Sequence, residues 1–226
     1  MVQETHRVLH THKYDTVFML SSYIFSVLAF ITFFVGALTY NKYKNSFLKY
    51  FLFYLLYEFL TELTGYYTGF ILIKNTFFIY NVYLFVTVIF LLILFRHYVK
   101  RYKNYINFML IVYVIFYICN VFFIQKTLQV SQTYSVILGS IFIVLGSIIL
   151  FIELLNSDEI LRINKLLLFW ISIGVLLFYA GILPIYVMAN FLNYKGLFDY
   201  ILLPLNIIMY GCFITGFLIS KKEYNL

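Results

Sequence analysis

Two carboxyl residues, Glu58 and Glu62, lie one helical turn apart inside a long apolar stretch of the sequence. A charge at membrane depth is costly, so such residues face a bundle interior or a wet cavity, where they bind protons, cations or ligands. At about 100° per residue they share a helix face with Tyr50, Tyr54, Thr61, Gly65, Thr68 and Gly69. This seam predicts a functional site. The alternative is a seam of small residues that only lets two helices pack closely.

A cationic partner for these carboxyls is missing from the sequence around them. The interior of each long apolar stretch lacks Lys, Arg and His, and Arg96 and His97 lie only at the end of one stretch. Two neighbouring carboxylates in a low dielectric cannot both stay ionised cheaply. We therefore expect at least one of Glu58 and Glu62 to be protonated at neutral pH, or to be neutralised by a cation that enters from outside.

Further aromatic, amide and hydroxyl residues fall at similar depth in the other apolar stretches. A site of this kind between helices is typically lined by aromatic groups with a few polar ones. We predict an outward-opening cavity with Glu58 or Glu62 at its floor, Asp199 near its mouth, and ligand or proton contacts from Tyr54, Thr61, Tyr80, Asn81, Tyr83, Tyr117, Asn120, Tyr186, Asn206 and Tyr210. The alternative is a belt of interfacial Tyr residues together with interhelical hydrogen bonds from Asn.

The elements that must position these groups are transmembrane helices. Of the 226 residues, 64% are hydrophobic and 11% charged, with a mean hydropathy of +0.94, which is too apolar for a water-soluble surface. The runs are continuous and too long for barrel strands, so we predict an all-α bundle of seven spans. Their predicted ranges are Thr16–Tyr40, Phe47–Ile73, Phe77–Val99, Ile106–Gln125, Tyr134–Leu155, Lys165–Phe191 and Phe198–Ser220.

The distribution of Lys and Arg predicts how these spans are oriented. In the seven-span arrangement, 11 of the 16 basic residues fall on one side, and cytoplasmic loops carry such an excess. This places residues 1–15 outside as an uncleaved tail, residues 16–220 in the plasma (cytoplasmic) membrane, and residues 221–226 in the cytoplasm as a tail. The net charge of +7 then reflects topology and attraction to anionic lipids, so no nucleic-acid partner is expected. A basic loop that recruits a protein is the alternative.

A repeated small-residue pattern marks the fifth predicted span. The sequence Leu-Gly-Ser-Ile occurs at residues 138–141 and again at 145–148. Small residues stacked along one face let another backbone approach closely, so this face is expected to pack within the bundle or across a homodimer, through Gly139, Ser140, Gly146 and Ser147. Glu153, at the end of the same span, is expected to pair with Arg96 or Arg162.

Several membrane chemistries need residues that the predicted spans lack. The last span has no Lys for a retinal Schiff base, and all four His residues lie outside the spans or at an edge, which argues against intramembrane zinc or Ser–His hydrolysis. Phosphate-binding glycine loops are also absent. We therefore expect no enzymatic activity, no catalytic residues and no cofactor; the enzymatic alternative that these residues leave open is carboxyl-only acid–base chemistry on a lipid. His6, His10, His12 and Asp15 could approach a metal ion, but no metal site is predicted.

Three classes of function fit this description. The first is a sensor or receptor, in which an outward cavity binds a small ligand, a proton or a cation and shifts the proline-containing sixth and seventh helices, so that the basic inner loops signal to a separate partner. The second is a proton- or cation-coupled transporter or channel that uses Glu58 and Glu62. The third is a partner-dependent membrane effector subunit of a stress or defence system. Toward the cytoplasm the seam offers only Tyr54 and Tyr50, which resembles a plug more than a water path and favours the sensor.

Overall fold

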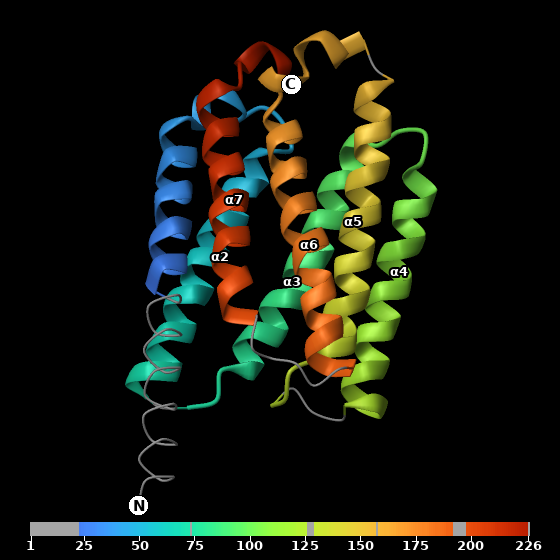
Figure 1. The fold of residues 1–226 in the computed structure, drawn as a ribbon. Helices are drawn as coiled ribbons and strands as arrows, with labels where there is room; N and C mark the ends of the chain where they lie inside the picture. Colours follow the sequence, from blue (N-terminus) through green and yellow to red (C-terminus); the bar gives the residue numbers. More distant parts are fainter. Residues whose placement is uncertain (1–22, 73, 126–128, 157, 192–197, 226) are drawn as a thin grey trace, which may run out of the picture.

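The computed structural model describes residues 23–72, 74–125, 129–156, 158–191 and 198–225, and within these ranges the chain is helical, without strands. Seven α-helices run side by side (Figure 1). After a first helix at Tyr23–Leu38 come α2 (Lys49–Tyr66), α3 (Phe77–Tyr98), α4 (Lys103–Cys119), α5 (Thr133–Leu155), α6 (Leu167–Phe191) and α7 (Phe198–Ile219). Short π-helical segments, Tyr67–Ile71 and Asn120–Ile124, extend α2 and α4.

Five of these helices are long and apolar enough to cross a membrane, namely α3, α4 with its π-helical extension, α5, α6 and α7. In lipid, a helix satisfies its own backbone hydrogen bonds, which is why such apolar runs fold this way. The first helix is also apolar, although its described part is shorter. The helix α2 differs because it carries three charged residues, Lys49, Glu58 and Glu62. The chain is thus a helical membrane protein with one unusually polar helix.

The predicted spans match the helices closely within the described residues. The α3, α5, α6 and α7 bounds differ from the predicted ranges by at most two residues, and α2 with its π-helical extension covers residues 49 to 71. Pro184 and Pro204 lie inside continuous helices. Residues 1–15, and with them the His residues of the predicted tail, lie outside the described residues.

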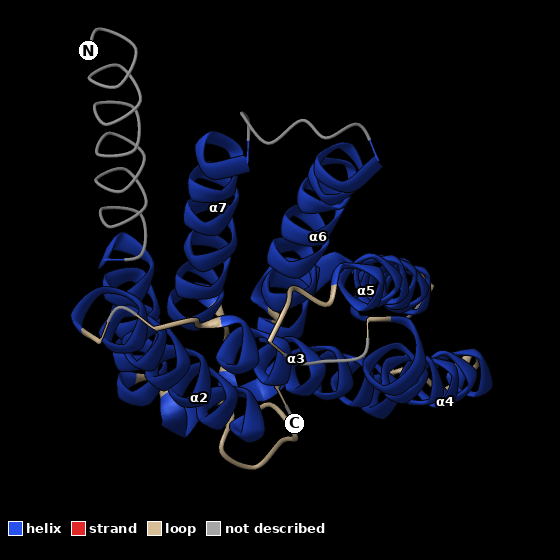
Figure 2. Cartoon of the chain, turned by 90° about the horizontal axis from the view of Figure 1, so that it is seen from below, coloured by secondary structure: helices blue, strands red, loops and turns tan. Residues whose placement is uncertain are grey.

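Successive helices alternate in direction, so the loops gather at two ends of the bundle (Figure 1). One end, at the top of Figure 1 and called here the basic end, holds the C-terminal segment and the connections 39–48, 99–102 and 158–166. Seen along the helices, α3 lies in the middle (Figure 2) and packs against α2, α4 and α5, while α6 packs against α5 and α7. By their positions in these connections and at the adjoining helix ends, the basic residues at this end are Lys42, Lys44, Lys49, Arg96, Lys100, Arg101, Lys103, Arg162, Lys165, Lys221 and Lys222.

The basic end is held by hydrogen bonds between distant segments. Lys42 Nζ donates to the main-chain oxygens of Phe217 and Leu218 at 2.9 and 2.8 Å, where the last turn of α7 leaves carbonyls unpaired. Asn225 is 4% exposed, and its Oδ1 accepts from the backbone N–H of Leu167, 2.9 Å away, at the start of α6. Residues 221–225, predicted as a tail, are therefore packed against the bundle.

The predicted ion pair of Glu153 with Arg96 or Arg162 is wrong. The Glu153 carboxylate instead accepts backbone N–H groups from Lys100 at 2.8 Å and from Arg101 at 3.1 Å. These amides lie in the turn between α3 and α4, where they have no helical acceptor, and a buried or half-buried N–H needs a partner. The two arginines bind other side chains, Asn107 for Arg96 and Tyr224 for Arg162.

The small residues of α5 pack within the bundle. Gly139, Ser140, Gly146 and Ser147 are all buried. A Cβ at Gly139 would lie 2.7 Å from Val88 Cγ2 on α3, and one at Gly146 would lie 3.0 Å from a ring carbon of α3. Glycine is thus required here for close approach of two helices, as the packing alternative predicts. A homodimer through these residues stays a prediction.

Candidate functional site

Glu58 lies in the interior of the bundle, on α2, with 2% of its surface exposed. Its Oε1 accepts hydrogen bonds from the hydroxyls of Tyr83 on α3 and Tyr210 on α7, each at 3.0 Å. One carboxyl oxygen therefore joins three helices. The other, Oε2, is buried and has no hydrogen-bond partner among the described residues.

Four tyrosines surround this carboxyl: Tyr54, Tyr179 and Tyr210 are buried, and Tyr83 is half-buried. The Tyr54 hydroxyl lies 3.5 Å from the Tyr83 hydroxyl and donates at 3.5 Å to Thr87 Oγ1. Tyr179, on α6, is also buried and interacts electrostatically with Glu58. Hydroxyls from α3 and α7 thus bind one carboxyl, with Tyr54 of α2 and Tyr179 of α6 as further neighbours. We call Glu58, Tyr54, Tyr83, Tyr179 and Tyr210 the Glu58 cluster.

Glu62 lies one turn farther along α2, away from the basic end, and is half-buried. Its Oε2 is 3.5 Å from the hydroxyl of Tyr80, which can donate to it. Gly65 makes room for this ring, because a Cβ at that position would lie 2.8 Å from Tyr80 Cζ. The second carboxyl is therefore more accessible than Glu58 and is held by a single long contact.

Three more predicted site residues, Asn81, Tyr117 and Asn120, form a separate polar group at the end opposite the basic end. We call these residues and their partners Gln125, Gln132 and Ser135 the amide cluster. Asn81 binds the loop before α5, its Nδ2 donating to Val130 O at 2.8 Å and its Oδ1 accepting from Gln132 N at 3.2 Å. The Tyr117 hydroxyl donates to the main-chain oxygen of Asn81 at 3.0 Å. Asn120 Nδ2 lies 2.7 to 2.8 Å from three oxygens, in Gln125, Gln132 and Ser135. These contacts fasten α3, α4 and α5 together.

The remaining predicted residues lie outside these groups, and their contacts are with their own helix or with the hydrophobic core. Thr61 Oγ1 donates to Tyr57 O at 2.9 Å, and Asn206 Nδ2 donates to Leu202 O at 2.9 Å, so both satisfy the backbone of their own helix. Tyr186 packs against the hydrophobic core. The side chain of Asp199, predicted near the cavity mouth, lies outside the described residues. The predicted set thus divides into the Glu58 cluster, the Glu62–Tyr80 pair, the amide cluster and three residues, Thr61, Tyr186 and Asn206, that belong to none of these groups.

Aromatic side chains fill the bundle between the Glu58 cluster and the basic end. Phe51 is fully buried and packs edge-to-face on Phe213 with ring centroids 5.1 Å apart, and its ring centroid lies 6.2 Å from that of Phe217. Tyr43 covers this group from the loop at the basic end, its ring 5.5 Å from that of Phe217. These buried rings lie along α2 and α7 between Glu58 and the basic end.

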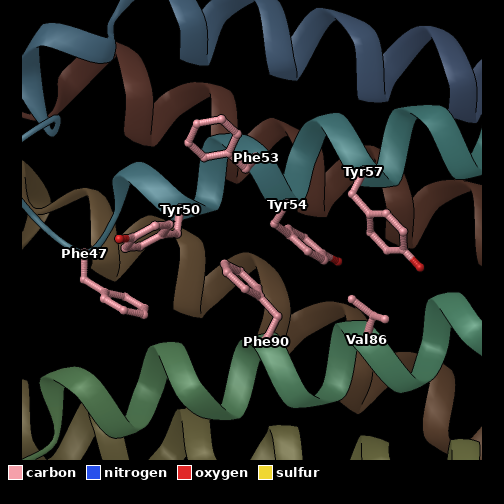
Figure 3. A pocket seen from close by; sticks show the side chains of 7 residues that line it. All are labelled: Phe47, Tyr50, Phe53, Tyr54, Tyr57, Val86 and Phe90. Carbon is pink, nitrogen blue, oxygen red and sulfur yellow. The ribbon is translucent and has the colours of Figure 1, made fainter.

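A groove of about 410 Å³ opens on the outside of the bundle between α2 and α3 (Figure 3). Its lining is almost wholly aromatic or aliphatic, and Tyr54 is the one member that also belongs to the Glu58 cluster. The other lining residues are Phe47, Tyr50, Phe53, Tyr57, Val86 and Phe90. This groove faces the surroundings of α2 and α3, whereas the predicted cavity was to open at one end of the bundle.

The chemistry available to this arrangement is that of a carboxyl without a cation. Among the described residues, no three His, Cys, Asp or Glu side chains gather in a way that could hold a metal ion. Glu58 offers one free oxygen, and hydroxyl groups are its neighbours. A single free oxygen can take a proton, whereas Ca²⁺ binds about six to eight oxygen ligands.

Sequence reasoning missed Gln132 and Ser135, which the structure places at the centre of the amide cluster. Both are polar, stand three residues apart and precede the apolar part of α5, which was a readable sign of a shared helix face. The α2–α3 groove was also missed.

Comparison of the chain with protein-family models, with curated proteins and with solved structures found no match.

Proposed function

We propose that this chain is a seven-helix sensor of the plasma membrane, with its N-terminus outside, in which Glu58 binds a proton. The buried Oε2 without a partner carries the proposal, because an uncompensated carboxylate in a dry interior is strongly disfavoured and a bound proton removes its charge. The ionisable groups that face Glu58 are Glu62 and Tyr54 from α2, Tyr83 from α3, Tyr179 from α6 and Tyr210 from α7. None of these supplies a positive charge.

The proposed output is a change in how α2, α3 and α7 pack. Loss of the proton makes Glu58 a carboxylate, which recruits hydroxyl donors more strongly than a neutral carboxyl does. Both bonds to Oε1 cross between helices, so this change acts on helix positions. Pro204 lies between Tyr210 and the start of α7 and removes a backbone donor, which weakens the helix there. The signal would leave through the basic loops to a separate partner, and no enzymatic step is assigned to the chain.

A proton- or cation-coupled carrier is the second candidate, and Glu62 favours it. This half-buried carboxyl lies one turn from Glu58 and could relay a proton from the end opposite the basic end. The buried rings of Phe51, Phe213 and Phe217 weigh against a path that continues to the basic end. The sensor therefore ranks first.

The test separates flux from conformational change. Purified protein in liposomes is assayed for proton and monovalent-cation flux, wild type beside the Glu58→Gln, Glu62→Gln double variant. In parallel, spin labels at the exposed positions Leu63 on α2 and Ile207 on α7, with Cys119 and Cys212 replaced by Ser, report the distance between these helices against pH.

The sensor predicts no flux and a pH-dependent distance that Glu58→Gln removes and Glu62→Gln leaves in place. Flux that the double variant abolishes would make the protein a carrier. A distance change that survives Glu58→Gln would remove the role assigned to this carboxyl.

A further inference from the structure

The α2–α3 groove continues into a second, polar hollow at the basic end. This hollow has a volume of about 360 Å³ and shares Phe47 and Tyr50 with the groove. Its other lining residues are Asn45, Ser46, Lys49, His97 and Tyr98. The apolar groove and the polar hollow therefore adjoin each other on the outside of the bundle.

The polar hollow is suited to an anion. Lys49 contributes a positive charge, its Nζ lying 5.2 Å from the centre of the Tyr50 ring. The His97 imidazole is fixed by stacking on Phe47, with ring centroids 4.3 Å apart and an interplanar angle of 17°. Asn45 and Ser46 add polar groups, and no acidic residue lines either the hollow or the groove.

The groove matches the shape of a hydrocarbon chain that lies along the membrane normal. Tyr50 and Tyr57 are two turns apart on α2, about 10 Å at 1.5 Å per residue, and Phe47 extends the groove toward the basic end. One leaflet contributes about half of the ~30 Å hydrocarbon thickness. Phe53 and Tyr50 remain 60% and 45% exposed, so this apolar surface is open to whatever surrounds the bundle.

We propose that this surface binds an anionic phospholipid, with one acyl chain in the α2–α3 groove and the phosphate between Lys49 and His97. The apolar groove and the basic hollow lie in the order in which a lipid presents its chain and its headgroup. On the proposed topology this is a lipid of the cytoplasmic leaflet, where anionic headgroups attract basic residues. The site does not depend on the proton proposal for Glu58.

The lipid would also contact the Glu58 cluster at one point. Tyr54 lines the groove, its ring stacks on Phe90 at 4.7 Å with an interplanar angle of 3°, and its hydroxyl is 3.5 Å from that of Tyr83. A chain lying against Tyr54 and Phe90 restrains the tyrosine that adjoins the carboxyl. The acyl chain would therefore lie next to the Glu58 cluster without entering it.

The experiment uses native mass spectrometry and thermal unfolding of the full chain with added phosphatidylglycerol or, as the neutral control, phosphatidylcholine. Val86→Phe fills the groove, and Val82→Phe, one turn away, equally exposed at 37% and outside the groove, is its matched control. Lys49→Gln tests the headgroup site against Lys103→Gln, an exposed lysine at the same end.

Phosphatidylglycerol is expected to stay bound and to raise the unfolding temperature more than phosphatidylcholine does. Val86→Phe should remove this difference and Val82→Phe should keep it. Lys49→Gln should weaken phosphatidylglycerol binding about fivefold, the effect of one lysine near an anionic headgroup, and Lys103→Gln should not.

Equal binding of the two lipids, or equal effects of the paired variants, would overturn the proposal. A second copy of this chain in the groove would overturn it too. That arrangement would show as a disulfide-linked dimer of Val86→Cys in membranes, with the native cysteines replaced by Ser.

Discussion

Replacing Tyr210 by Phe removes one of the two hydroxyls on Glu58 Oε1 and nothing else. The ring is 2% exposed and packs edge-to-face on Phe213 at 6.2 Å, so the phenylalanine fills the same volume and leaves no cavity. The free-energy cost is therefore that of one hydrogen bond at 3.0 Å. Such a bond contributes about 0.6–1.5 kcal/mol when its acceptor is neutral and about 1.5–3 kcal/mol when its acceptor is charged.

The charge on Glu58 can be read from a double-mutant cycle. Glu58→Gln keeps a carbonyl-type Oε1 that accepts the same hydroxyls but can never be ionised. If Glu58 holds a proton, Tyr210→Phe costs about 1 kcal/mol in both the wild-type and the Gln background, and the coupling between the two sites stays below about 0.5 kcal/mol.

The assay is reversible unfolding of the purified protein in mixed micelles at neutral pH, with helix content as the readout. Tyr83→Phe serves as an independent repeat on α3, since its hydroxyl lies at the same 3.0 Å from Oε1. Tyr105→Phe, at a 63% exposed ring, is the control, and its effect should lie within about 0.5 kcal/mol. A cost above about 2 kcal/mol in wild type that falls below about 1 kcal/mol in the Gln background would show an ionised carboxylate and refute the bound proton.

Three further outcomes are expected. Replacing both Glu58 and Glu62 by Gln should leave folding intact or raise the unfolding temperature. In the unfolded chain both carboxyls are ionised at neutral pH, so folding has to bind a proton or bury a charge, whereas an amide requires neither. A large loss of stability would make the two carboxyls structural. Gly139→Ala should destabilise the bundle by about 1–3 kcal/mol, because its Cβ would lie 2.7 Å from Val88 Cγ2. Gly211→Ala, whose Cβ would have nothing within 4 Å, should be neutral or stabilising by about 0.5–1 kcal/mol. Thermal unfolding measures both effects. A reporter enzyme fused to the C-terminus should be active in the cytoplasm, and an external reporter would contradict the seven-span topology.

The helices could be predicted from the sequence because the membrane imposes a length and a polarity on each span. Apolar runs bounded by polar clusters gave the ends of α3, α5, α6 and α7 to within two residues. The interior position of Glu58 followed from the same argument, since a carboxyl at depth has to face the bundle. Composition and periodicity were sufficient for these features.

The partners of the polar residues could not be predicted in the same way. Asn81 binds the backbone of the loop before α5, and the path of that loop depends on how α3, α4 and α5 are rotated about their axes. Glu153 binds backbone amides and not Arg96 or Arg162 for a similar reason, since the turn at Lys100 presents its N–H groups only in the folded chain. The groove beside Tyr54 reflects the fit between two helix surfaces, which periodicity within one helix does not contain.

The two hydroxyls on Glu58 also set an order for biogenesis. Tyr83 follows Glu58 by 25 residues and Tyr210 by 152 residues, so at about 5–20 residues per second the second donor is synthesised roughly 8–30 s after the carboxyl. Throughout that interval α2, which carries three charged residues, remains in the translocon or in lipid with one of the two hydrogen-bond donors to Glu58 still missing. A chain that ends before α7 would never supply the Tyr210 hydroxyl to Glu58. The incompletely hydrogen-bonded carboxyl would let membrane proteases distinguish unfinished molecules from finished ones.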